Sequence, residues 1–543
     1  MTRIMTANFS ERLLASEARL FAGALVLLAL PLLIWGPLAT QDGPAHVYNA
    51  QLMLELWQSP SPEFARWIGF SERFDPTWPF HFMLVGLLQL FGPEWAEILC
   101  QVFAVIAVPL GARYALRAVS SDAGPWAWLA LPFAYNYTFH MGFYGYCIGI
   151  GASLWMTGYW LRQEGHWTLR SLLLMALIAV LAFYAHLFAM LMAGICMLPS
   201  ALVRLHGHFQ REGLVLMLRR QVLPQALAFA PALLLTAGFL MARESAPIAA
   251  SADLAYRLGS TGAISFLLAY NLDELLAGAL LALCVAVFGA MVLLRAWRRQ
   301  PVAHWSLLVG ALFAVLMMLL MKDTEVISPN GMHGGGYMLF RIQPFIWMFA
   351  LLWLAANLSA RRLQLAAILA GLGISALGAA LRAPEYANLQ QQLAEYDQAA
   401  QYLQAGDLVL AINAHRGGIR DDGVPLSRFA DVFRHRINRI AVSTGAFSIN
   451  NYEASMGYFP LVYRDAVNPF AVLGDLESSP NDLDIQAYER ALGRPLDWVL
   501  LWLPDSTFNP TMPVQDQLQR LGFRRVASSS PRGLLWLYQR PES

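Results

Sequence analysis

A short polar segment directly after the first long apolar run holds the residues best placed to do chemistry. The apolar run extends from about residue 20 to residue 39, and residues 40–46 contain Asp42 and, one helical turn later, His46. An aspartate at the mouth of a membrane helix has lost part of its water, is costly to keep and is often functional. The next residues, to Trp57, form an amphipathic stretch suited to a helix on the membrane surface. A spanning helix, an acidic segment and a surface helix are typical of enzymes that act on lipid-linked substrates outside the membrane.

Further polar and aromatic residues are expected to gather at the same membrane face. An aromatic, glycine-rich segment at 135–144 offers ring faces and hydroxyls that suit a sugar, and Arg341 carries a guanidinium fork that matches phosphate. A cation that enters an apolar helix needs an anionic partner. The expected substrate-binding residues are His46, His81, His140, Tyr144, His186, His333 and Arg341.

Each of these residues also has a structural interpretation. Asp42 could only cap the surface helix, because aspartate is a favoured N-cap. A single histidine is more often a hydrogen-bonded interface residue than a ligand, and Arg341 could form a structural ion pair. The histidine spacing predicts no metal ligands, although a divalent metal stays open as a cofactor. The functional interpretation is favoured because these residues converge on one face.

The composition places the chain among polytopic membrane proteins. Of 543 residues, 57% are hydrophobic and 13% are charged, against about 25% charged residues in soluble domains. The net charge of +1 gives no reason to expect nucleic acid as a partner. The four cysteines lie in apolar runs, so we predict core thiols and no disulfide. The N-terminal run is too long for a cleavable signal and is interpreted as a signal anchor.

Eleven spanning helices are predicted, and arginine-rich loops place them relative to the cytoplasm. The predicted spans are 20–39, 95–117, 124–139, 143–161, 170–185, 187–203, 222–241, 275–294, 304–321, 338–358 and 363–381. Arginine clusters fall on one side of this arrangement, which the positive-inside rule assigns to the cytoplasm. To keep the arginines on one side, we interpret residues 80–92 as a juxtamembrane helix. For the same reason, we interpret residues 170–203 as two short spans with a break at 184–186.

The chain divides into three predicted regions. Residues 1–19 are a cytoplasmic N-terminus, residues 20–382 are the transmembrane domain with an outer loop at 40–94 that bears juxtamembrane helices, and residues 383–543 are a periplasmic α/β domain. Within this last region, helix-forming residues occupy 383–404, strands are expected at 407–413, 437–443, 496–503 and 534–539, and a helix is expected at 514–521.

This layout resembles the GT-C class of integral-membrane glycosyltransferases, which includes protein O-mannosyltransferases and lipid A aminoarabinose transferases. The resembling parts are Asp42 with its surface helix, the entry to the second juxtamembrane helix at 79–81, the arginine-ended helix 95–117, the break at 185–186 and the outer C-terminal domain. Two features depart from the class: Asp42 is followed by glycine, where many members have glutamate, and the outer loop 136–146 has no acidic residue.

The resemblance implies a polytopic α-helical GT-C-like fold and an inverting transfer of a hexosyl or pentosyl group. The donor is a sugar on a polyprenyl phosphate, and the acceptor is an extracytoplasmic glycan, lipid or protein. Asp42 is the implied general base, Arg341 holds the departing lipid phosphate, and the histidines orient the acceptor, hold Asp42 or help to bind phosphate. The expected location is the bacterial inner membrane, in the cell envelope.

Two other classes of function compete with this interpretation. A transporter or flippase for a lipid or glycolipid would show inverted repeats and midplane breaks, whereas this chain has no internal repeat. A non-catalytic binding or assembly protein would use the outer domain, where the polar loop at 413–418 is a candidate surface. Replacing Asp42 by asparagine separates a transferase from either alternative.

Overall fold

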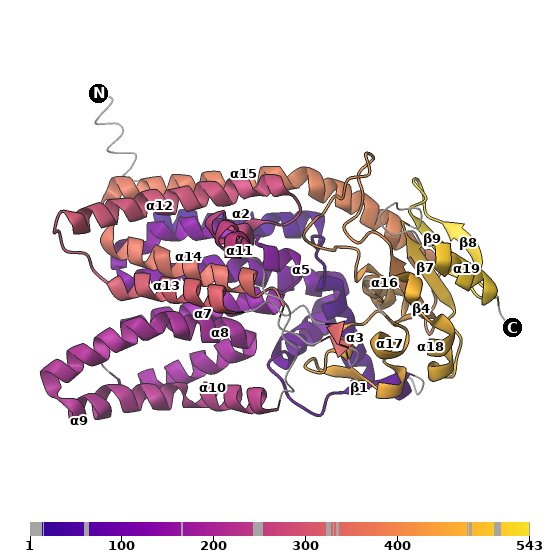
Figure 1. Ribbon diagram of the computed structural model, residues 1–543, viewed down its shortest axis with the longest axis horizontal. Helices are drawn as coiled ribbons and strands as arrows, with labels where there is room; N and C mark the ends of the chain where they lie inside the picture. Colours follow the sequence, from indigo (N-terminus) through magenta and orange to yellow (C-terminus); the bar gives the residue numbers. More distant parts are fainter. Residues whose placement is uncertain are drawn as a thin grey trace.

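In the computed structural model, long helices form one end of an elongated molecule and a mixed α/β region forms the other (Figure 1). The structure describes residues 14, 16–58, 64–163, 167–242, 254–321, 327–328, 331–332, 336–474, 476, 480–503 and 512–541. The predicted fold class is confirmed, because a helical region carries apolar spans and a small sheet follows near the C-terminus.

Seven stretches of helix in the described residues are long and apolar enough to cross a membrane. They lie at Glu17–Trp35, Trp78–Val119, Leu169–Glu212, Leu214–Met241, Leu272–Trp297, Met338–Asn357 and Arg361–Gln401. The corresponding elements are α2 (Glu17–Trp35), α5 (Trp78–Val119), α8 (Leu169–Glu212), α9 (Leu214–Met217) with α10 (Leu223–Met241), α12 (Leu275–Trp297), α14 (Met338–Asn357) and α15 (Arg361–Tyr396). The predicted spans at 143–161 and 304–321 are helices as well, α7 (Tyr144–Arg162) and α13 (Trp305–Leu320).

The predicted span at 124–139 takes a different form from the one expected. It is a 3-10 helix, η1 (Ser121–Phe133), followed by the short α6 (Tyr137–His140). Prolines at 125 and 132 lie inside η1, and a proline lacks the amide hydrogen that a regular α-helix needs. A 3-10 helix is nonetheless an extended element, because it rises about 2.0 Å per residue.

Two of the long helices are broken near the end of the bundle that faces the C-terminal region. In α8 the break is at His186, whose φ and ψ are −171° and 111°, within the predicted 184–186. The carbonyl of Ala185 approaches Gly145 near the start of α7, whereas Arg204 bonds to the carbonyls of Trp160 and Leu161 near its end. The two arms of α8 therefore run in opposite directions, as two short spans would.

The break in α5 separates a short arm from a membrane-length arm. Gly92 has a φ of +80°, a conformation that glycine adopts without steric cost. The first arm covers the apolar segment at 80–92 that we predicted to be juxtamembrane. The second arm packs closely on α7, where a Cβ at Gly111 would meet the backbone of Gly151. Small residues at such crossings let membrane helices approach each other.

The loop after α2 is joined to the C-terminal region. It contains α3 (Gly43–Gln58), α4 (Phe64–Trp67) and β1 (Ile68–Phe70), and β1 pairs antiparallel with β6 (Leu461–Tyr463). Arg439 also forms an ion pair with the buried Glu97 of α5. These contacts hold the C-terminal region against the loop after α2 and against α5.

The C-terminal region is built on a five-stranded mixed sheet with the order β5-β4-β7-β9-β8. Its strands are β4 (Leu408–Asn413), β5 (Phe447–Ser448), β7 (Trp498–Trp502), β8 (Arg524–Ser528) and β9 (Leu535–Gln539). Strand β4 is parallel to both β5 and β7, whereas β9 is antiparallel to β7. Three of the expected strands occur as β4, β7 and β9, and the expected helix 514–521 occurs as α19 (Met512–Arg520).

The strand predicted at 437–443 is wrong. These residues form α16 (Arg436–Thr444), which buries Ile437, Ile440 and Ala441. The spacing of these buried positions is three and one, which is helical, but β-branched residues made the short apolar run resemble a strand. The predicted domain boundary at 382/383 falls inside α15, which continues out of the bundle to Tyr396.

The remaining elements are short connections. They are α11 (Leu254–Gly262), η2 (Leu218–Val222), η3 (Ser265–Leu267), η4 (Leu272–Glu274), β2 (Ile327–Ser328), β3 (Gly331–Met332), η5 (Asp397–Gln401), η6 (Glu453–Ser455), η7 (Asp465–Val467), α17 (Pro469–Val472), η8 (Pro480–Asp482) and α18 (Ile485–Leu492).

Candidate functional site

The backbone of Asp42 is held by the aromatic loop between α6 and α7. The amide of Gln41 donates to the carbonyl of His140 at 3.0 Å, and the amide of Asp42 donates to the carbonyl of Met141 at 3.1 Å. Gly142 has a φ of +84°, and a Cβ there would collide with the backbone of Asp42 and Gly43. The loop therefore requires glycine at this position and fixes Asp42 at the start of α3.

The carboxylate of Asp42 is bonded by side chains on both oxygens. Tyr452 donates its hydroxyl to Oδ2 at 2.9 Å, and Gln41 donates to Oδ1 at 3.1 Å. Nε2 of His435 lies 3.6 Å from Oδ1. The described residues include no hydrogen bond from the first turn of α3 to this carboxylate. The interpretation of Asp42 as a helix cap alone therefore has no support from its contacts.

Burial makes Asp42 a weaker acid than an ordinary aspartate. The residue is 4% exposed, and this loss of water raises the pKa of its carboxyl group from 3.8 to about 6, although His46 and the hydrogen bonds from Gln41 and Tyr452 act in the opposite direction. A carboxylate with a pKa near the working pH is a more effective proton acceptor than an ordinary aspartate.

A second cluster lies beside Asp42 and joins three separate elements. Nδ1 of His46, from α3, contacts Oε1 of Glu453, and Nε2 of His81, from α5, lies 2.8 Å from Oε2 of the same carboxylate. Glu453 belongs to η6 in the C-terminal region, and His81 and Glu453 are both 0% exposed. One ligand atom from each of the three residues lies within 4.8 Å of the others. Two imidazoles and a carboxylate are a donor set that divalent metals bind.

In this cluster, the carboxylate and the imidazoles stabilise each other's charged forms. Burial acts against the charged form of Glu453, but the imidazoles of His46 and His81 outweigh it and lower the pKa of the carboxyl group to about 2. Burial likewise acts to lower the pKa of His46, but the carboxylate of Glu453 outweighs it and leaves that pKa raised. Burial and Arg434 lower the pKa of His435, so this ring stays neutral beside Asp42.

Arg341 and His186 occupy a second part of the site, toward the membrane helices. The guanidinium of Arg341 lies 4.8 Å from the ring centre of Phe143 and 5.8 Å from that of Tyr146. The ring of His186, at the break in α8, packs edge-on against Tyr146 at 4.9 Å. The charge of Arg341 interacts with that of Asp42. Among the described residues, no carboxylate lies within ion-pair distance of Arg341.

The side chains of two further predicted residues, His140 and Tyr144, bond to neighbouring segments and not to Asp42. The ring of His140 bonds to the carbonyl of Asn136 at 2.8 Å and to the hydroxyl of Tyr386 at 2.7 Å, so only its backbone supports Asp42. The hydroxyl of Tyr144 lies 2.6 Å from that of Thr40 and braces the segment before Asp42. His333 lies outside the described residues.

The sequence analysis missed the contribution of the C-terminal region. Tyr452, Glu453 and His435 all contact Asp42 or the two histidines, from more than 370 residues away. A run of four polar residues at 450–453 was the available signal. The loop at 413–418, which we did single out, instead borders a small hollow.

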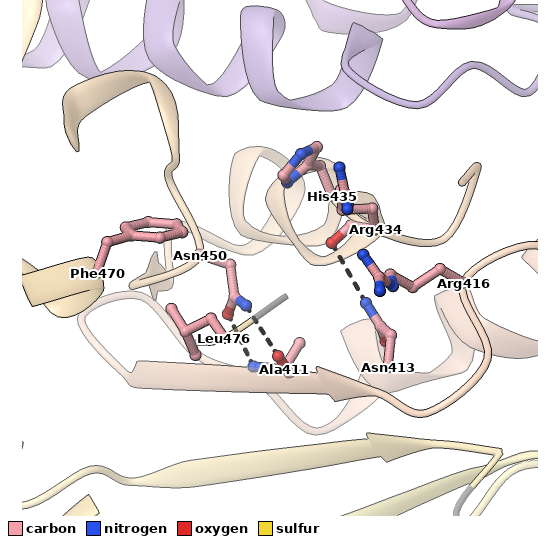
Figure 2. Close-up of a pocket in the computed structure, with 8 residues that line it drawn as sticks. All are labelled: Ala411, Asn413, Arg416, Arg434, His435, Asn450, Phe470 and Leu476. Carbon is pink, nitrogen blue, oxygen red and sulfur yellow. Dashed lines mark hydrogen bonds between the residues drawn. The ribbon is translucent and has the colours of Figure 1, made fainter. Parts of the chain in front are cut away.

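That hollow lies at the end of β4 and reaches the site through His435. It is lined by Ala411, Asn413, Arg416, Arg434, His435, Asn450, Phe470 and Leu476 (Figure 2). The amide of Asn450 bonds twice to the backbone of Ala411, as a neighbouring strand would. The position is a switch point, with parallel strands on both sides of β4, where open α/β sheets commonly bind ligands.

Solved structures of other proteins are similar to this chain in layout. No protein-family model and no curated sequence matches it. Crystal structures of ArnT from Cupriavidus metallidurans, apo and bound to undecaprenyl phosphate, match at 12% identity with TM-scores of 0.41 and 0.42, over 97% of this chain and 98% of that chain. The Archaeoglobus fulgidus oligosaccharyltransferase in complex with Zn and sulfate matches at 12% identity and a TM-score of 0.42, over 89% of this chain and 68% of that one.

These proteins belong to the GT-C class that the sequence resembles. At this identity and TM-score, however, the matches carry no argument about what this chain does. Its function must be inferred from its own site.

Proposed function

We propose that this protein is a membrane glycosyltransferase that moves a sugar from a polyprenyl-phosphate carrier to an acceptor outside the cytoplasm. The observation that carries the proposal is the buried carboxylate of Asp42, in a site that also holds the cationic Arg341. A buried carboxylate with a pKa of about 6 lies at the outer end of the first apolar helix. It interacts electrostatically with a guanidinium that aromatic rings flank. Sugar transfer from a lipid phosphate needs a proton acceptor for the attacking hydroxyl and a cation for the departing phosphate.

In the proposed reaction, Asp42 accepts the proton of the acceptor hydroxyl as its oxygen attacks the anomeric carbon. The bond between that carbon and the phosphate oxygen breaks, and the polyprenyl phosphate leaves with the electron pair. Arg341 stabilises the negative charge that grows on the phosphate. Attack from the face opposite the leaving group inverts the anomeric carbon.

The remaining side chains support these two. Tyr452 and Gln41 hold the Asp42 carboxylate in one orientation, and His186 stands beside Tyr146 on the Arg341 side, where it helps to bind phosphate. His46 and His81 position Glu453 and the C-terminal region next to Asp42. His140 and Tyr144 act by shaping the loop and not by touching the substrate.

The lipid-linked donor reaches this site from the bilayer, and the acceptor is a glycan, lipid or protein. We propose the inner membrane as the location, with the N-terminus in the cytoplasm and residues 383–543 in the periplasm. Asp42 is 4% exposed and Tyr452 covers it. The acceptor therefore reaches the carboxylate only when the segment around Tyr452 moves.

The test is a transfer assay with the full chain in lipid nanodiscs. A panel of radiolabelled polyprenyl-phosphate sugars is offered to the wild-type protein and to Asp42→Asn, with cell-envelope extract as the acceptor source. Label that leaves the carrier with the wild-type protein alone supports the proposal. If a well-folded wild-type protein releases no label from any donor, the proposal fails, and movement of intact labelled lipid between leaflets would instead indicate a flippase.

A further inference from the structure

We propose that His46, His81 and Glu453 form a binding site for a divalent metal ion of the zinc type. The three side chains are buried and converge from α3, α5 and η6. Imidazole nitrogen and carboxylate oxygen are ordinary zinc ligands, and two histidines with one glutamate are a known catalytic combination. No short sequence spacing signals the site, because His81 and Glu453 are 372 positions apart.

The hydrogen bonds behind the two histidines give the strongest support. Nε2 of His46 lies 3.1 Å from the carbonyl oxygen of Gly142, and Nδ1 of His81 lies 3.1 Å from that of Thr77. A carbonyl oxygen only accepts, so each of these ring nitrogens must carry the hydrogen. In the neutral ring the other nitrogen then presents a lone pair. In both histidines, that nitrogen is the one that faces Glu453.

This pattern is the one expected around a bound metal. Histidines that ligate metals almost always donate their second ring nitrogen to a carbonyl, a carboxylate or water, which fixes the ring orientation. Here both histidines do so with backbone carbonyls of rigid segments. Nε2 of His81 and Oε2 of Glu453 are 2.8 Å apart, so a bound tetrahedral zinc ion would require these atoms to separate to roughly 3.3 Å.

The surroundings favour a tightly held ion over a loosely solvated one. The ring of Phe80 lies 5.3 Å from that of His46, and the ring of Phe459 lies 5.6 Å from that of His81. Such an apolar shell limits water access to a metal and tunes its chemistry. Three protein ligands leave a tetrahedral ion one open position, as in catalytic zinc sites, for water or an oxygen of a substrate.

A metal at this position would also clamp the molecule. It would tie the outer loop and the first arm of α5 to η6, which neighbours the Tyr452 that covers Asp42. The inference does not depend on sugar transfer. A chain that binds zinc but transfers no sugar would support this site and refute the proposed function, and the reverse result would do the opposite.

The experiment measures metal content and melting temperature of the purified full chain in nanodiscs. After removal of metal with a chelator, the protein is titrated with Zn²⁺, and with Co²⁺ as a coloured probe. We expect roughly one ion per chain and a melting temperature that rises with metal concentration. Glu453→Gln and His81→Gln should each weaken binding more than tenfold, whereas His435→Gln, which replaces a buried histidine of the same site that is not a ligand, should bind as the wild type does.

Two results would overturn the site. One is a folded wild-type protein, judged by circular dichroism, that takes up neither ion and whose melting temperature ignores both metal and chelator. The cluster would then be an ion pair between Glu453 and protonated histidines. The other is binding that Glu453→Gln and His81→Gln leave unchanged, which would locate the ion elsewhere. The titration of the wild-type protein decides the first of these results without any variant. The site can therefore be tested even where a variant fails to fold.

Discussion

The two polar regions at the end of the bundle nearest the C-terminal region differ in how far the protein satisfies its own charges. Around Asp42, both carboxylates have side-chain partners on each oxygen, and these contacts join the C-terminal region to α3 and α5. Around Arg341, aromatic rings flank the guanidinium, and no described carboxylate pairs with it. A cation in an apolar setting needs an anion. The first region is therefore preorganised by the fold, whereas the second is the place where we propose that the lipid phosphate binds.

The largest expected effect comes from Asp42→Asn, which keeps the shape of the side chain and removes the proton acceptor. Transfer should fall by about 10²- to 10⁴-fold, the usual contribution of a general base. The melting temperature should stay close to that of the wild type, because the amide oxygen still accepts from Tyr452. Initial rates and thermal melts of the same preparations check both statements. A variant that keeps more than a tenth of the activity would show that Asp42 is not the general base.

Arg341→Gln should have the next largest effect and acts on the other region. Loss of the cation is expected to lower transfer by about 10²- to 10³-fold, as for the loss of one charge-stabilising donor. Arg341→Lys is the matched control: it keeps the charge but loses the fork, so it should recover only part of the rate. Equal activities for the two variants would show that charge at this position is irrelevant.

The raised pKa of Asp42 predicts a pH profile with an acid limb. The base must be ionised, and its pKa is about 6, so transfer should fall about tenfold for each pH unit below that value. The hydroxyl of Tyr452 bonds to the carboxylate and lowers its pKa, so Tyr452→Phe should move the inflection to higher pH. An unmoved inflection in this variant would contradict the assigned contact.

The smallest effect is expected outside both regions, at the partner of His140. Tyr386→Phe removes the hydroxyl that bonds to the His140 ring. Loss of a buried partner should cost roughly 1–3 kcal/mol of folding stability and leave the rate of transfer unchanged. Chemical denaturation and initial rates test this pair of outcomes. A large loss of transfer with intact stability would show that the His140 ring takes part in the reaction.

The sequence was informative where local chemistry decides structure. Asp42 at the end of an apolar run and the break at His186 follow from burial cost and helix length, and both features are present. The partners Tyr452 and Glu453 could not be predicted, because only the tertiary fold brings the C-terminal region onto the outer loop. The strand expected over α16 failed for another reason, since a short β-branched run carries little periodicity.

Binding of undecaprenyl phosphate to Asp42→Asn and Arg341→Gln tests the division of labour between the two regions most directly. Affinity can be measured in nanodiscs with a labelled lipid, without any sugar or acceptor. We predict that Asp42→Asn binds the lipid phosphate as tightly as the wild type, although its transfer is slowed, and that Arg341→Gln binds it more weakly. Wild-type affinity in Arg341→Gln, or an equal loss in Asp42→Asn, would contradict the account.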